Sequence, residues 1–214
     1  LVLLLYDSLA NPNSQFAIKK QDLFDLIFTF DPNDAKMHGY HYIYSTLSDI
    51  SGTLKQDERK INVFYVGRAV NRLPLMHKVL KKIAESVESF EFYISGVSDK
   101  KDCNYPEIIK YNKYVPYTQV LEKVLNTDCL IEFVMPNQTG ITLRTCEAII
   151  FNKKLITNNK KIIDTPFYNP EYISIFTDEN DLDIDFLKKE IVVDYKYSGY
   201  FSPNIIIEKI KKMN

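Results

Sequence analysis

A polar segment with the composition of a binding loop occupies residues 135–142, between an apolar strand and an apolar helix. Residues 129–134 are apolar enough for a buried strand, and Pro136 and Gly140 interrupt regular structure before a helical period resumes at Leu143. The first backbone N–H groups of a helix lack intrahelical partners, and the positive end of the helix dipole lies there. The arrangement therefore predicts a site for an anion such as phosphate.

Glu147 is a second residue that could contact a ligand. At helical spacing it lies between Leu143 and Ile150, at the edge of the stripe that should face the interior. One interpretation is a surface ion pair with Arg144, which would contribute only about 0.2–0.5 kcal/mol. The other is that the carboxylate binds a pair of ligand hydroxyls, such as those of a ribose. Spacing alone leaves both open and favours the ion pair.

A Gly-Arg pair, Gly67-Arg68, follows another apolar strand at residues 61–66, and Arg72 comes one helical turn later. Glycine lets a backbone approach a phosphate closely, and an arginine fork can neutralise that phosphate. The alternative is a glycine turn with two solvated arginines. Because ligands bind at the carboxyl ends of parallel strands, we expect this pair to share one edge of a sheet with residues 135–142.

Other residues with catalytic or metal-binding chemistry form weaker patterns. Asp183 and Asp185 have a spacing with which some glycosyl transfer enzymes hold a divalent metal, but a solvated turn that caps the following helix is the preferred interpretation. His38 and His41 belong to a tyrosine-rich loop, and His77 falls outside the apolar stripe of its helix and is expected to be exposed. The sequence has no Walker loop and no GxGxxG fingerprint.

Composition excludes several classes of protein. The 214 residues are 45% hydrophobic and 26% charged, with a formal net charge of −1, so nucleic acid is not an expected partner. Cys103, Cys129 and Cys146 lack metal-ligand spacing and suggest reduced thiols in a cytoplasmic protein. No apolar run approaches the ~20 residues that span a bilayer. Because the chain begins without Met in an apparent buried strand, we expect a fragment.

Strands alternate with helices along the chain, which predicts an α/β fold with a parallel sheet covered by helices on both faces. Strands are expected at 1–5, 26–30, 61–66, 90–94, 108–111, 129–134, 154–157 and 172–176, and helices at 15–21, 119–125 and 203–212. Asp31 should cap a short helix that has Pro32 at its first position. The expected organisation is a first alternating series at 1–47, a linker at 48–60 and a second alternating series at 61–214.

From Ile61 onward the chain resembles bacterial lipopolysaccharide and capsular polysaccharide biosynthesis glycosyltransferases of the GT-B fold. The segments that carry the resemblance are 64–68, 128–132, 136–140, 143–148, 152–157 and 167–170. The Pro-Asn-Gln-Thr-Gly run at 136–140 is fairly specific, whereas a Gly-Arg pair and a helix glutamate occur across many GT-B enzymes. The resemblance implies a Rossmann-like C-terminal domain at 61–214 that binds a nucleotide-sugar donor. It also implies a Rossmann-like N-terminal domain that binds the acceptor, of which residues 1–47 would be a remnant.

Roles carried over by position follow from that resemblance alone. Gly67, Arg68 and Arg72 would meet the donor diphosphate, the loop from Thr139 to Thr142 would approach its phosphate or sugar, and Glu147 would hold the ribose. The donor-binding candidates are Gly67, Arg68, Arg72, Asn137, Gln138, Thr139, Gly140, Thr142, Arg144 and Glu147. No cofactor or metal is expected, because GT-B enzymes usually stabilise the departing diphosphate with N–H groups, a helix dipole and cationic side chains. No catalytic base is assigned, since it usually comes from the N-terminal domain.

The first hypothesis is a glycosyltransferase that moves a sugar from a nucleotide-sugar to a growing bacterial surface polysaccharide. Its acceptor would be a saccharide or a lipid-linked saccharide. The enzyme would be cytoplasmic, with the inner face of the cell membrane as an option through peripheral contacts of the missing N-terminal domain. The alternative is a non-catalytic Rossmann-like nucleotide-binding or scaffold domain. A nucleotide-binding oxidoreductase is disfavoured by the missing glycine fingerprint.

Overall fold

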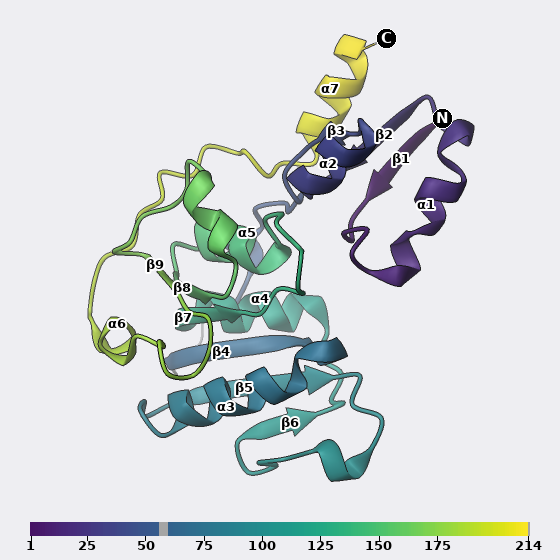
Figure 1. Cartoon of the computed structure of the whole chain (residues 1–214). Coiled ribbons are helices and arrows are strands. Elements are labelled where there is room, and N and C mark those ends of the chain that lie inside the picture. Colours follow the sequence, from purple (N-terminus) through teal and green to yellow (C-terminus); the bar gives the residue numbers. More distant parts are fainter. Residues whose placement is uncertain (56–59, 214) are drawn as a thin grey trace.

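Two parallel sheets organise the chain in the computed structural model, which describes residues 1–55 and 60–213 (Figure 1). The first sheet has the order β1-β2-β3, and its strands are β1 (Val2–Leu5), β2 (Leu26–Thr29) and β3 (His41–Tyr42). The second has the order β6-β5-β4-β7-β8-β9. Its strands are β4 (Ile61–Arg68), β5 (Phe90–Ser95), β6 (Ile109–Tyr111), β7 (Thr127–Glu132), β8 (Lys154–Thr157) and β9 (Ile173–Ile175). All the strand pairs are parallel.

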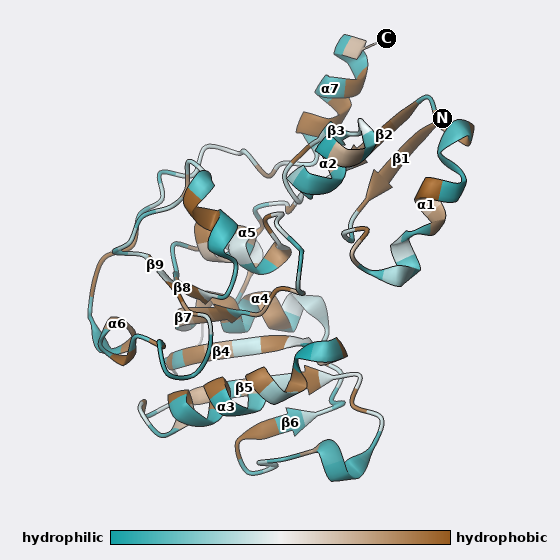
Figure 2. Cartoon of the chain, in the orientation of Figure 1, coloured by the Kyte–Doolittle hydropathy of each residue, from teal (hydrophilic) through white to brown (hydrophobic). Residues whose placement is uncertain are grey.

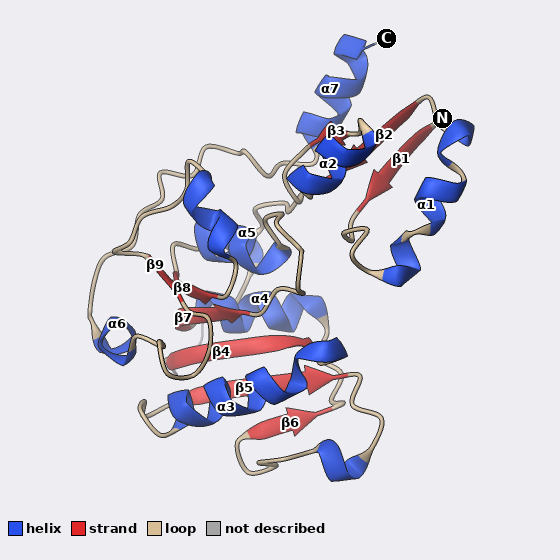
Figure 3. Ribbon diagram, viewed as in Figure 1, coloured by secondary structure: helices blue, strands red, loops and turns tan. Residues whose placement is uncertain are grey.

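Helices cover both faces of the six-stranded sheet (Figure 3). The helices of the chain are α1 (Phe16–Lys19), α2 (Pro32–His38), α3 (Leu73–Ala84), α4 (Tyr117–Leu125), α5 (Leu143–Ile150), α6 (Ile184–Lys188) and α7 (Asn204–Met213). Along β4, Val63 and Tyr65 pack in one core with α3 and α6, and Phe64 packs in the other with α4 and α5. This period of two fills both faces with apolar side chains. The predicted α/β fold with a doubly covered parallel sheet is therefore confirmed.

The three-stranded sheet has its own small cores. The strands β1 and β2 are hydrophobic along their length (Figure 2). Asp31 caps α2 as predicted, because its carboxylate accepts bonds from Asn33 N at 2.9 Å and Asp34 N at 3.3 Å. The predicted helix at 15–21 is wrong in extent, since only one α-helical turn forms there, between two short 3-10 segments. Such short segments depend on packing more than on helix propensity.

The helix α7 returns to the three-stranded sheet and completes it (Figure 1). Its Ile206 is buried with Phe28 of β2 and Ile43, which follows β3. Lys209 Nζ donates to the carbonyl of Tyr42 at 2.9 Å. The strands β1 to β3 therefore share a core with residues near the other end of the sequence.

Three further expectations from sequence can be compared with the structure. His77 is wrongly predicted to be exposed: it is only 7% exposed, because Tyr111 Oη lies 2.8 Å from Nε2 and Asn104 covers Nδ1. The predicted linker at 48–60 lies partly outside the described residues, and the proposed domain boundaries stay a prediction. Within the described parts of the chain, no helix has the length and apolar character that crossing a membrane requires.

Candidate functional site

A hollow of about 340 Å³ opens at the carboxyl edge of the six-stranded sheet. Its walls are the start of α3, the segment after β7 and the segment after β8. They include Arg72, Leu75, Asn137, Gln138, Thr139, Asn158, Asn159, Lys160 and Lys161. Three of the described lining residues are cationic and none is acidic, so the hollow favours an anionic ligand. This edge is also where open parallel sheets bind ligands.

Arg72 connects the ends of two strands and has one N–H group without an acceptor in the part of the chain that the structure describes. Its guanidinium donates to the carbonyl oxygens of Phe133, after β7, and of Arg68, at the end of β4. Its Nε is buried and has no hydrogen-bond partner among the described residues. A buried N–H without a partner is costly, and an anionic group entering the hollow could supply the missing acceptor.

The two residues of the Gly-Arg pair have different roles: Gly67 is required by packing, and Arg68 is an exposed cation. A Cβ at Gly67 would lie 2.2 Å from Tyr65 Oη, so the absence of a side chain there is already required by internal packing. Arg68 is exposed at the same strand end, and its guanidinium lies near Gly96, after β5. Arg68 is therefore free to contact a ligand at this edge. The glycine at position 67 is explained by internal packing against Tyr65 and needs no ligand to account for it.

The loop before α5 is held by carboxylates of the protein itself. Asp31, which is 0% exposed, accepts bonds from Thr139 N at 2.8 Å, Thr139 Oγ1 at 2.7 Å and Gly140 N at 3.2 Å. Thr142 caps α5 by accepting a bond from Arg144 N, and its hydroxyl donates to buried Glu132. The N–H groups of Thr139, Gly140 and Arg144 are thus already satisfied by side chains of the protein, and the anion-binding role of the loop stays a prediction.

Glu147 lies in a buried cluster beneath Tyr117. Its carboxylate contacts the Arg144 guanidinium and accepts a bond from Tyr117 Oη at 3.0 Å. The Glu147 side chain is only 1% exposed, so the expected surface location of the Arg144 pair is wrong. Burial raises the pKa of Glu147, against the charge of Arg144 and the bond from Tyr117, which lower it. A ribose could reach this carboxylate only if Tyr117 moved.

The segment after β8 contributes lining residues that the sequence analysis did not assign. Asn158 Oδ1 accepts a bond from Val134 N at 2.6 Å, and Asn159 Nδ2 donates to Gly140 O at 3.2 Å. Lys160 and Lys161 follow and line the hollow. The signal available in the sequence was the run Asn-Asn-Lys-Lys directly after a predicted buried strand, at the edge where ligands were expected.

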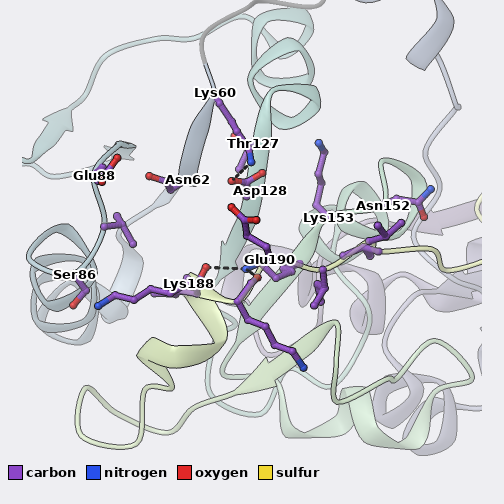
Figure 4. Close-up of a pocket in the computed structure, with 17 residues that line it drawn as sticks. Lys60, Asn62, Ser86, Glu88, Thr127, Asp128, Asn152, Lys153, Lys188 and Glu190 are labelled. Atoms are coloured by element: carbon purple, nitrogen blue, oxygen red, sulfur yellow. Dashed lines mark hydrogen bonds and ion pairs between the residues drawn. The ribbon is translucent and has the colours of Figure 1, made fainter.

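A second, larger hollow of about 810 Å³ lies at the opposite edge, where β4, β7 and β8 begin (Figure 4). Its lining carries both signs of charge, and Lys60 pairs with Asp128 at 3.1 Å. Lys154 spans the sheet edge here, with Nζ donating to the carbonyl oxygens of Phe186, Leu187 and Lys189. Although this hollow is larger, its lining mixes acidic and basic side chains, and it lies at the edge opposite the one where open parallel sheets bind ligands, so we place the candidate site at the carboxyl edge.

The acidic residues near α6 act as predicted for a turn. Asp183 caps α6 by accepting a bond from Phe186 N at 2.9 Å, and Asp181 accepts bonds from Thr177 N and Asp178 N. Within residues 1–55 and 60–213, no cluster of three or more His, Cys, Asp or Glu side chains could hold a metal ion.

Known proteins share this fold at low sequence identity. No protein-family model matches the sequence, and no curated protein matches it significantly. A glycosyltransferase of avilamycin A biosynthesis, AviGT4, matches with a TM-score of 0.62 and 9% identity over 87% of this chain and 62% of its own. An α-glucosyltransferase in complex with UDP and a DNA 13-mer gives a TM-score of 0.62 and 11% identity over 99% of this chain and 70% of its own.

Two further structures extend this comparison. Sucrose-phosphate synthase of Thermosynechococcus elongatus gives a TM-score of 0.56 and 12% identity over 99% of this chain. A putative UDP-N-acetylglucosamine 2-epimerase of Listeria monocytogenes gives 0.56 and 12% over 95%. The chain covers 66% and 63% of their respective lengths. At such identities the likeness concerns the fold, and the chain therefore has the Rossmann-like parallel-sheet fold found in these glycosyltransferases and this epimerase.

Proposed function

We propose that this chain is the donor-binding part of a glycosyltransferase that uses a nucleotide-sugar. The observation that carries the proposal is the hollow at the carboxyl edge, with cationic Arg72, Lys160 and Lys161 and no acidic lining residue among those described. Arg68 lies exposed at the same edge. Cations in a partly enclosed site stabilise the negative charge that develops on a departing diphosphate.

The shared fold supports the choice of ligand class. Of the four structures compared above, two are glycosyltransferases by name, and one of these is in complex with UDP. The other two are a sucrose-phosphate synthase and a putative UDP-N-acetylglucosamine 2-epimerase. We propose a nucleoside diphosphate sugar as the donor for this chain as well. A growing bacterial surface polysaccharide, lipid-linked or free, is the proposed acceptor, on the basis of the sequence resemblance from Ile61 onward.

The internal bonds of the site favour one alternative. Glu147 is covered by Tyr117, and the N–H groups of Thr139 and Gly140 are used by Asp31. A domain that binds a nucleotide without transferring a sugar could keep these contacts permanently. Release of free sugar from a radiolabelled donor would exclude the non-catalytic alternative, because such a domain yields none above the uncatalysed rate.

Calorimetry with UDP and uridine tests the proposed function. The diphosphate should bind more tightly than the nucleoside, and Lys160→Gln should weaken UDP binding about five- to tenfold without affecting uridine. Lys188→Gln, at the opposite edge of the sheet, is the matched control. EDTA should leave binding unchanged. Equal affinity for UDP and uridine in the wild type would refute the assignment of phosphate to this edge.

A further inference from the structure

One buried carboxylate connects the two sheets. Asp31 follows β2 and is 0% exposed. On its own side it accepts bonds from Asn33 N and Asp34 N in the first turn of α2. Across the junction it accepts three more bonds, from Thr139 N, Thr139 Oγ1 and Gly140 N. Five donors therefore converge on one carboxylate, which compensates its burial without a cation.

The same loop is held at its carbonyl oxygens. Ser45 Oγ, which follows β3, donates to Ile141 O at 2.6 Å, and Asn159 Nδ2 donates to Gly140 O at 3.2 Å. A Cβ at Gly140 would lie 2.3 Å from the carbonyl oxygen of Phe30, so the loop approaches the first sheet at backbone distance. Asn137 adopts a φ of +68°, which turns the chain into the loop. The loop conformation is thus fixed from both sides.

This conformation matters for the candidate site, because the loop forms one wall of the hollow. Thr139 and Asn159 both line it. If the bonds to Asp31 were lost, Thr139 would lose two constraints on its position and Gly140 would lose one, and the wall that faces Arg72 would no longer be fixed. Ordering a loop on binding costs free energy that a preformed loop avoids.

We propose that Asp31 is a positioning residue that fixes the ligand-binding loop from the neighbouring sheet. Asp31 itself does not touch the ligand. The N–H groups of Thr139 and Gly140 belong to this clamp between the two sheets, which consists of the bonds from Thr139 and Gly140 to Asp31. Phosphate is bound by the cationic residues of the hollow instead. The inference rests on the proposed function for the class of ligand, but the clamp itself can be measured without a ligand.

Amide hydrogen exchange tests the clamp. In Asp31→Asn, the exchange rates of the Thr139 and Gly140 backbone amides should rise at least tenfold. The asparagine side chain has only one acceptor oxygen, and its NH₂ group would face the backbone N–H groups that now donate to the carboxylate. Asp34→Asn is the matched control: Asp34 is also buried in the first turn of α2, but its carboxylate binds Leu9 N and Ser8 Oγ and not the loop. Unchanged exchange in Asp31→Asn would overturn the proposal.

Ligand binding tests the consequence for the site. Asp31→Asn should weaken UDP three- to tenfold and leave uridine unchanged, and Asp34→Asn should change neither. Tighter UDP binding in Asp31→Asn would overturn the proposal, since the freed N–H groups would then be the phosphate site. A wild type that binds no UDP would refute the proposed function, while the exchange rates would still decide the clamp. If Asp31→Asn does not fold, Thr139→Val removes only the hydroxyl bond, and the Gly140 amide should still exchange faster.

Discussion

The Glu147–Arg144 pair should respond very differently to the loss of either partner. Burial raises the pKa of Glu147, so folding disfavours its charged form relative to the unfolded chain, and Glu147→Gln removes that charge. The arginine left behind keeps a bond to Val66 O at 3.1 Å, lies over the Phe64 ring at 5.7 Å and is 12% exposed. We therefore expect Glu147→Gln to change the free energy of unfolding by less than about 1 kcal/mol at pH 7.

Arg144→Gln should be severe, because it leaves the carboxylate of Glu147 with 1% exposure and only Tyr117 as its principal donor. Removing one partner of a buried pair costs about 3–5 kcal/mol. The raised pKa means that the folded state binds this proton more tightly than the unfolded state, so stability from this group is fully present below pH 4.5 and is lost as pH rises through the folded pKa. The deficit of Arg144→Gln should therefore shrink on acidification.

Urea unfolding of both variants at pH 7 and pH 5 measures these differences. A loss above about 3 kcal/mol in Glu147→Gln together with less than 1 kcal/mol in Arg144→Gln would refute the reasoning, because the carboxylate would then be the stabilising partner. UDP titration adds the functional test: if Glu147 holds ribose, Glu147→Gln should weaken UDP by about 1–3 kcal/mol while the fold persists. Unchanged affinity would remove Glu147 from the site.

Three other perturbations test the structure at separate points. Burial raises the pKa of Glu91, but bonds from Lys123 and Tyr93 lower it to about 2. The contribution of Glu91 to stability should therefore be present above pH 4.5 and be lost as pH falls toward 2. Acid unfolding of Glu91→Gln should lack this loss. Gly140→Ala should destabilise by about 1–3 kcal/mol in urea melts through its clash with Phe30, and an unchanged midpoint would contradict the close approach. Lys154→Met should cost about 2 kcal/mol in the same assay, because three carbonyls lose their donor.

The elements with a strong local pattern could be predicted from the sequence. β4, β7 and β8 have apolar runs of strand length, and the apolar stripe of α3 repeats at helical spacing. The cap of α2 also follows from neighbouring residues, since Asp31 and Pro32 are adjacent. In each case the determining interactions are within a few positions in the chain.

The arrangement of the site could be predicted only in part. The sequence predicts an anion-binding loop before α5, yet Asp31, which holds that loop, lies 108 residues from Thr139, and no local pattern indicates that contact. The burial of His77 has the same origin, because its partner Tyr111 is 34 residues away. Lys160 and Lys161 were missed because two lysines after a strand are common surface residues, and only the hollow distinguishes them. The donor-binding roles of the other candidates stay predictions.

The return of α7 to the first sheet has a consequence for how the molecule folds. Lys209 and Tyr42 are 167 residues apart, and Ile206 completes a core that the first three strands begin. Contacts of such long sequence separation form slowly, because a large loop must close before they contribute. During synthesis, the core of β1 to β3 would stay incomplete until α7 is made, while the six-stranded sheet emerges and assembles. We therefore expect the three-stranded sheet to become fully ordered after the six-stranded sheet, although its strands precede that sheet in the sequence.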